Sequence, residues 1–238
     1  MKKLIVLLLA AAMLLSLAAC ASTADTETTG TTSGNSSAAI RSDRGGGTVN
    51  VNGGSYTSNG YNSPAVYSTA AITVQNAELT ANNSEALVIE GKNSIALTNC
   101  TVSGNMSSTK GSSSSENVHT VMIYQSMSGD ADAGTSEFSM TGGSLTGKNG
   151  NLFYITNTHC ILTLSGVTLK NGSTFTGTIN IADNAEGGTA VSDNAVVTIG
   201  SGCTWTLTGD CTITSLTNNG TINFNGHTIT LDDGTVLR

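Results

Sequence analysis

Short segments in which every second residue is apolar recur along most of this chain. Each segment places two apolar residues around one polar or small residue, and a corner rich in Asn or Gly follows. Alternation with a period of two predicts β-strands that turn one side inward and the other side toward water. The first apolar position of each segment is held by Val49, Ile72, Ile95, Phe138, Leu162 and Val197.

The spacing of these segments predicts how the strands are joined. Successive first positions are 23, 23, 43, 24 and 35 residues apart. A period in the twenties is typical of a solenoid, in which each copy forms one coil and only stacking buries its apolar side. The two long intervals contain polar insertions at 107–115, 126–136 and 183–194. Such loops leave a solenoid at its corners and can carry function.

Two further apolar segments complete each copy. After the first corner comes a small inward position, then a larger one two residues later, and a third apolar strand closes most copies. Three short strands and three corners in about 23 residues predict an all-β fold, a single-stranded right-handed parallel β-helix. The small positions are Gly54, Ala77, Cys100, Gly143 and Val167, and the larger ones are Tyr56, Leu79, Val102, Leu145 and Leu169.

The first nineteen residues have the pattern of a secretory signal peptide. Lys2 and Lys3 precede an apolar run at 4–15, and Leu-Ala-Ala precedes Cys20. This Leu-Ala-Ala-Cys resembles the bacterial lipobox, whose cysteine is lipid-modified after cleavage just before it. The alternative is an ordinary cleaved signal with an incidental cysteine. The apolar run is too short for a transmembrane span.

The segment after Cys20 differs in composition from the repeats. Residues 21–37 are mostly Ser, Thr and Gly, which bury no core and predict a flexible tether. We therefore expect a signal peptide at 1–19, a lipidated cysteine and tether at 20–44, and a β-helix domain at 45–238.

The repeats from Thr48 to Gly172, with the closing stretch TWTLTGDCTITSLTNNGTINFNGHTITL at 204–231, resemble a family of bacterial surface proteins. These are adhesin-like lipoproteins with a right-handed parallel β-helix, the pectate-lyase superfold. The resemblance implies an exported protein, lipid-anchored in the cell membrane and facing the extracellular side. It says little about activity, since this superfold carries lyases, hydrolases, adhesins and inert stalks.

The net charge of the chain argues against one class of partner, nucleic acid. The formal charge of −7 becomes −9 when Lys2 and Lys3 leave with the signal peptide. An acidic chain without a basic stripe argues against nucleic acid as a partner.

The cysteines of the repeats are expected to be thiols. Cys100 falls in the small inward column and is expected to be a buried thiol. A disulfide between Cys203 and Cys211 stays open as an alternative, although an extended segment would hold them too far apart.

The residues favour a protein that is not an enzyme. Lyases of the superfold resemble one another in using an arginine base, but the arginines here are Arg41, Arg44 and Arg238. The pair Asp232-Asp233 is most simply an exposed turn. Asp130 and Asp132 could bind calcium weakly but lack the ligand number of a known loop. His119, His159 and His227 are expected at surfaces or corners, and we predict no metal and no cofactor.

A row of aromatic residues suggests where a ligand could bind. Tyr67, Glu90 and Tyr124 each follow a core residue of the third strand, and Tyr154 lies one place earlier in its coil. If these side chains point outward, Tyr67, Tyr124 and Tyr154 line one face, and aromatic rings among Asn and Thr suit sugars. The alternative is that some of them fill the core.

These observations predict a lipid-anchored, adhesin-like surface protein. Its partners would be the membrane, through Cys20, and glycans or host-surface proteins. The alternatives are a structural stalk without a ligand and a degenerate polysaccharide lyase or hydrolase.

The anchor is tested by the substitution Cys20→Ser. Without the thiol no lipid is attached, so we expect the variant to leave the membrane fraction and enter the soluble fraction. Cell fractionation with immunoblotting measures this. Fractionation identical to that of the unaltered protein would contradict the anchor.

Overall fold

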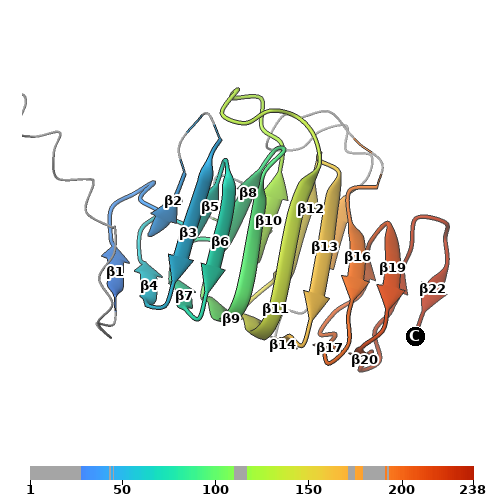
Figure 1. Cartoon of the computed structure of the whole chain (residues 1–238). Coiled ribbons are helices and arrows are strands. Elements are labelled where there is room, and N and C mark those ends of the chain that lie inside the picture. Colours follow the sequence, from blue (N-terminus) through green and yellow to red (C-terminus); the bar gives the residue numbers. More distant parts are fainter. Residues whose placement is uncertain are drawn as a thin grey trace, which may run out of the picture.

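The computed structural model describes residues 28–42, 44, 46–109, 117–170, 175–178, 191 and 193–238. In these ranges the chain forms β-strands joined by turns and loops, and no α-helix. The strands follow one another along the molecule, with β1 near one end and β22 at the other (Figure 1). No helix of these ranges is long and apolar enough to cross a membrane.

The larger of the two sheets contains 13 strands, and every pairing in it is parallel. Its strands are β1 (Thr29–Thr32), β3 (Thr48–Asn52), β4 (Ser55–Ser58), β6 (Ala71–Gln75), β7 (Glu78–Ala81), β9 (Ser94–Gly104), β11 (Ser136–Gly147), β13 (Cys160–Ser165), β14 (Thr168–Lys170), β16 (Val196–Ile199), β17 (Thr204–Thr206), β19 (Ser215–Asn218) and β20 (Thr221–Asn223).

The smaller sheet contains 9 strands in the order β2-β5-β8-β10-β12-β15-β18-β21-β22. They are β2 (Ile40–Arg41), β5 (Val66–Ser68), β8 (Leu87–Glu90), β10 (His119–Tyr124), β12 (Asn151–Thr156), β15 (Phe175–Thr178), β18 (Cys211–Thr212), β21 (Ile229–Thr230) and β22 (Val236–Leu237). Only the last pairing, between β21 and β22, is antiparallel. This short hairpin ends the sheet.

The first apolar positions of the repeats stack on one another in the larger sheet. Ile72 pairs with Val49 on one side and with Ile95 on the other. Phe138 continues the same file between Ile95 and Leu162, and Val197 follows. From Ile72 to Val197 these side chains are at most 1 % exposed and belong to one buried cluster. The predicted all-β fold with parallel strands and an internal apolar file is therefore confirmed.

The thiols lie inside this core. Cys100, Cys160, Cys203 and Cys211 are all buried and no disulfide joins them, so the alternative of a Cys203–Cys211 disulfide is wrong. Cys100 occupies the small inward position that its column predicts, opposite Gly143. Burial raises the pKa of the thiols of Cys100, Cys160 and Cys203, which keeps them protonated and unreactive.

The folded part begins earlier than residue 45. β1 pairs with β4 and β2 pairs with β5, although both lie in the predicted tether at 20–44. Ser55 N donates to Thr28 O at 2.9 Å, and Ile40 is buried in the core. The prediction missed this because backbone pairing with an existing sheet edge needs little apolar surface, and Thr suits a strand. The expected lipidation site and signal peptide lie outside the described residues.

Asparagines at the corners form two ladders across successive coils. In one, Asn76 Nδ2 donates to Asn52 Oδ1 at 2.9 Å. In the other, Asn82 donates to Asn59 and Asn105 donates to Asn82, each at 2.7 Å. The ladders hold the corners at the same register as the strands.

One of the three predicted insertions is described in full. The loop after β10, which contains residues 126–135, leaves the sheet edge and is drawn in yellow-green at the top of Figure 1. Most of the insertions at 107–115 and 183–194 lies outside the described residues.

Gly143→Ala tests the close stacking of coils. Gly143 has φ 82°, and an added Cβ would lie 2.0 Å from the carbonyl oxygen of Cys100. We expect urea unfolding to show a loss of stability clearly larger than the roughly 1–2 kcal/mol of a left-handed backbone alone. Gly53→Ala is the matched control, because Gly53 has φ 77° and nothing within 4 Å of its added Cβ. Equal losses for the two variants would argue against tight stacking at Gly143.

Candidate functional site

The outward face of the smaller sheet carries a second cluster of side chains, separate from the core. Parallel register places Tyr67 of β5 beside Val88 of β8, then Met122 of β10 and Tyr154 of β12. These side chains pack together with Tyr124 and share no member with the core cluster. The alternation of the strands thus sends them outward, yet most of them are shielded from solvent.

The structure brings the three predicted tyrosines to one face but does not expose them equally. Tyr67 is half-buried and Tyr124 is 9 % exposed. Tyr154 is 1 % exposed, so the expectation of an exposed stripe of three rings is wrong at this position. Its ring lies against the imidazole of His119, with 5.2 Å between the centroids. Tyr124 and Tyr154 are buried, as the alternative predicted, but in this second cluster and not in the cluster that contains the apolar file.

A pocket of about 420 Å³ opens on this face. Val88 and Met122 provide an apolar floor, and Tyr67 and Tyr124 stand beside it. Arg41, Arg44, Asn62 and other polar residues bring hydrogen-bonding groups to the rim. The lining residues are Ser36, Ala38, Arg41, Arg44, Asn62, Pro64, Tyr67, Thr69, Glu85, Val88, Glu90, Met122, Tyr124, Ser126, Ser128 and Asp130.

Glu90 is the centre of the hydrogen bonds in this pocket. It is 1 % exposed and lies beside Tyr124 in the register of β8 and β10. Its Oε2 accepts a hydrogen bond from the Tyr67 hydroxyl, and its Oε1 accepts one from Ser126. Ser128 donates to the same Oε1 at 3.2 Å. Three hydroxyl groups therefore replace the water that burial removes from this carboxylate.

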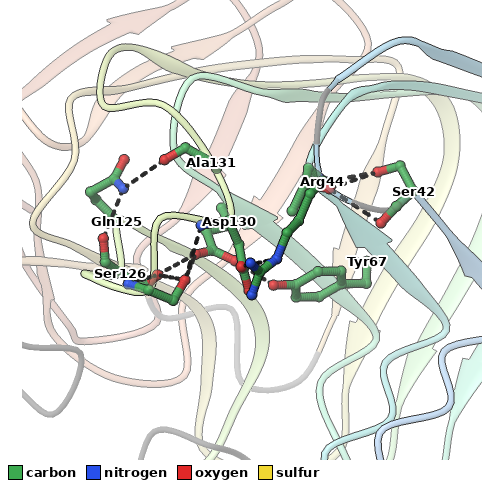
Figure 2. Close-up of polar contacts among 10 residues, drawn as sticks. Ser42, Arg44, Tyr67, Gln125, Ser126, Asp130 and Ala131 are labelled. Atoms are coloured by element: carbon green, nitrogen blue, oxygen red, sulfur yellow. Dashed lines mark hydrogen bonds and ion pairs between the residues drawn. The ribbon is translucent and has the colours of Figure 1, made fainter.

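The loop after β10 is held across the sheet by these contacts and by an ion pair. Asp130 Oδ1 lies 2.5 Å from Arg44 Nε, and Asp130 N donates to Ser128 Oγ at 3.2 Å. Figure 2 shows Asp130 turned toward Arg44 and Tyr67, with Gln125 and Ala131 joined on the other side of the loop. The guanidinium group of Arg44 already pairs with the carboxylate of Asp130. Asp130 is one of the two residues, with Asp132, that could bind calcium weakly.

A second buried carboxylate reaches the pocket from the start of β8. Glu85 is 1 % exposed, and its Oε1 lies 3.2 Å from Nε2 of the fully buried His119. Ser84 donates to Glu85 Oε2 at 2.6 Å. His119 Nδ1 lies 2.8 Å from the carbonyl oxygen of Asn117 and must donate there, because a carbonyl only accepts. Of the two positions expected for His119, a surface or a corner, the surface is wrong, because His119 is buried at the start of β10.

The residues of this pocket differ in how far the sequence predicts their place. Glu90 follows a core residue of the third strand, as Tyr67 and Tyr124 do, so the sequence predicts that its side chain points outward. Glu85 and His119 lie on successive coils, but the insertion between β9 and β10 hides their register. Arg41 and Arg44 lie in the segment for which the composition predicts a tether.

The environment of Tyr67 and Tyr124 keeps their hydroxyl groups protonated. Burial raises the pKa of Tyr67, and its hydrogen bond to the Glu90 carboxylate raises it further. Burial also raises the pKa of Tyr124, with the nearby Tyr67 and Glu90 adding to the effect. A side-chain hydrogen bond between Tyr67 and Tyr124 also affects both pKa values.

Comparison with protein-family models, with curated protein sequences and with solved structures finds no match for this chain. The interpretation of the pocket therefore rests on its own residues. Its combination of an apolar floor, two tyrosines and several polar side chains is suited to binding a small polar ligand.

The tyrosines predict a loss of stability in alkali. Above about pH 10 tyrosines ionise in the unfolded chain, whereas Tyr67 and Tyr124 keep their protons when folded. The unfolded state then binds fewer protons, so the free energy of unfolding falls as pH rises, by at most about 1.4 kcal/mol per pH unit for each tyrosine. Urea unfolding between pH 9 and pH 11.5 measures this fall.

The double variant Tyr67→Phe/Tyr124→Phe is expected to lessen that dependence, and the exposed Tyr61→Phe is its control. An unchanged slope in the double variant would contradict the assigned environment.

Proposed function

We propose that this protein is a lipid-anchored, adhesin-like protein of the bacterial surface that contacts glycans through the pocket on its smaller sheet. The pocket itself supports this function best. Two tyrosines stand beside the apolar floor formed by Val88 and Met122, and polar side chains surround them. Sugars present both a C–H face and a rim of hydroxyl groups, and such a site satisfies both.

The proposal includes a finer description of the fold. We propose that the two sheets wind as one right-handed β-helix of about 23 residues per coil. Support comes from the register, since Val49, Ile72 and Ile95 pair in succession. Right-handed connection between parallel strands is also the strong preference of proteins in general.

The location of the protein is proposed from the N-terminal pattern. Lipid attached to Cys20 would hold the domain at the outer side of the cell membrane after export. The net charge of −9 after removal of the signal peptide supports membrane contact through the anchor rather than through a basic surface. The same charge disfavours nucleic acid as a partner.

A second candidate is an enzyme that cleaves polysaccharides, because Glu85 and Glu90 line the same pocket. Paired carboxylates are the usual groups of glycoside hydrolysis. However, Glu90 is engaged by three hydroxyl donors and Glu85 by His119 and Ser84. These contacts favour binding over proton transfer. Release of reducing ends or of unsaturated uronides from a polysaccharide would favour the enzyme.

A glycan array probed with the full chain in detergent micelles tests the binding function. We expect Tyr67→Ala to lower the affinity for any glycan bound by at least roughly tenfold, because the ring and its hydroxyl both face the pocket. Arg41→Ala, at an exposed position of β2, is a second variant. Thr163→Ala, exposed on β13 of the larger sheet, is the control. Binding to no glycan would favour the stalk without a ligand.

A further inference from the structure

Two of the three carboxylates that line the pocket are neutralised by a basic partner. Asp130 pairs with Arg44 at 2.5 Å. Glu85 shares a contact of 3.2 Å with His119 Nε2, and a hydrogen bond there requires one proton between the two groups. Since His119 Nδ1 also carries a proton, the Glu85–His119 pair has no net charge, whichever of the two groups holds the shared proton.

Glu90 is the third carboxylate, and it has no cationic partner among the residues that the structure describes. Its donors are the hydroxyl groups of Tyr67, Ser126 and Ser128. Hydroxyl dipoles satisfy the oxygens but add no positive charge. A carboxylate that is 1 % exposed is poorly screened by water, so its negative potential extends into the pocket.

The arginines at the rim do not cancel this potential. The Arg44 side chain is 72 % exposed and already pairs with Asp130. Arg41 lies exposed on β2. Water and salt screen charges at such positions far more than they screen a buried charge. The inner wall of the pocket is therefore the part that attracts a cation.

The tyrosine rings strengthen this preference. Tyr67 and Tyr124 lie on the same wall as Glu90, and the face of an aromatic ring attracts an organic ammonium group. Beside them, Val88 and Met122 provide a floor without hydrogen-bond donors, which suits the C–H face of a sugar ring. A volume of about 420 Å³ is in the range of ordinary small-ligand sites.

We propose that the pocket selects amino sugars whose amino group is free and protonated, with the ammonium held against the tyrosines Tyr67 and Tyr124 and attracted by the negative potential of the buried Glu90. This inference rests on the proposed glycan-binding function and names the class of sugar. Acetylation of the same amino group removes its positive charge and so removes the attraction.

Isothermal titration calorimetry with the full chain in detergent micelles tests the selection. The probes are the β-1,4-linked disaccharide of glucosamine and its di-N-acetylated counterpart. We expect the free amine to bind at least roughly tenfold more tightly, because cation–π contacts and a buried opposite charge both stabilise the bound ammonium. Added salt should weaken the binding of the amine and leave that of the acetylated sugar unchanged.

Glu90→Gln removes the charge but keeps the size of the side chain, and it should abolish the preference. Glu78→Gln is the matched control, because Glu78 is exposed on β7 of the larger sheet. If circular dichroism shows that Glu90→Gln does not fold, the ammonium selection is tested by the preference of the unaltered protein for the amine and by the salt dependence of that preference.

The outcomes separate the two proposals. Acetylated sugar bound as tightly as the free amine, or more tightly, overturns the ammonium selection and leaves glycan binding in place. Binding of neither disaccharide, together with an empty glycan array, overturns both. Preference for the amine in Glu90→Gln equal to that of the unaltered protein overturns the role of this carboxylate.

Discussion

Parallel pairing of like residues in register is the constraint on which this structure depends. Each strand satisfies its backbone groups with the coils before and after it, and the same register stacks its apolar side chains into continuous files. A slip of one residue would turn an entire file toward water. The asparagine ladders and the glycine at the Cys100–Gly143 contact serve the same register, since both require coils to follow one another closely.

The two sides of the smaller sheet bury different kinds of side chain. Its inner side packs against the core through apolar side chains such as Val66, Ile123 and Phe153. Its outer side buries polar and charged groups, each of which needs partners of its own. Glu90 finds three hydroxyl donors, and Glu85 finds His119 and Ser84. These requirements fix the position of the loop after β10, because Ser126 and Ser128 reach Glu90 only when the loop crosses the sheet.

The pocket arises where segments of different origin meet. The regular coils provide its floor and its tyrosines, the loop after β10 provides Ser126, Ser128 and Asp130, and the first strands of the chain provide Arg41 and Arg44. A fold built from repeats therefore carries a site that is not repeated. Asp130 pairs with Arg44 and Glu85 lies against His119, whereas Glu90 is held by hydroxyl groups alone.

The sequence alone determined the all-β class, the parallel stacking of coils and the members of the internal file from Ile72 to Val197. It could do so because one repeated pattern dictates inward and outward positions in every coil. It also indicated that Tyr67, Tyr124 and Glu90 face the same way. Only the tertiary structure decided that Tyr154 is covered, that Glu85 meets His119, and that residues 29–41 add two strands. These results depend on contacts between segments separated by insertions or lacking the repeat, and no local pattern encodes the register or burial of such contacts.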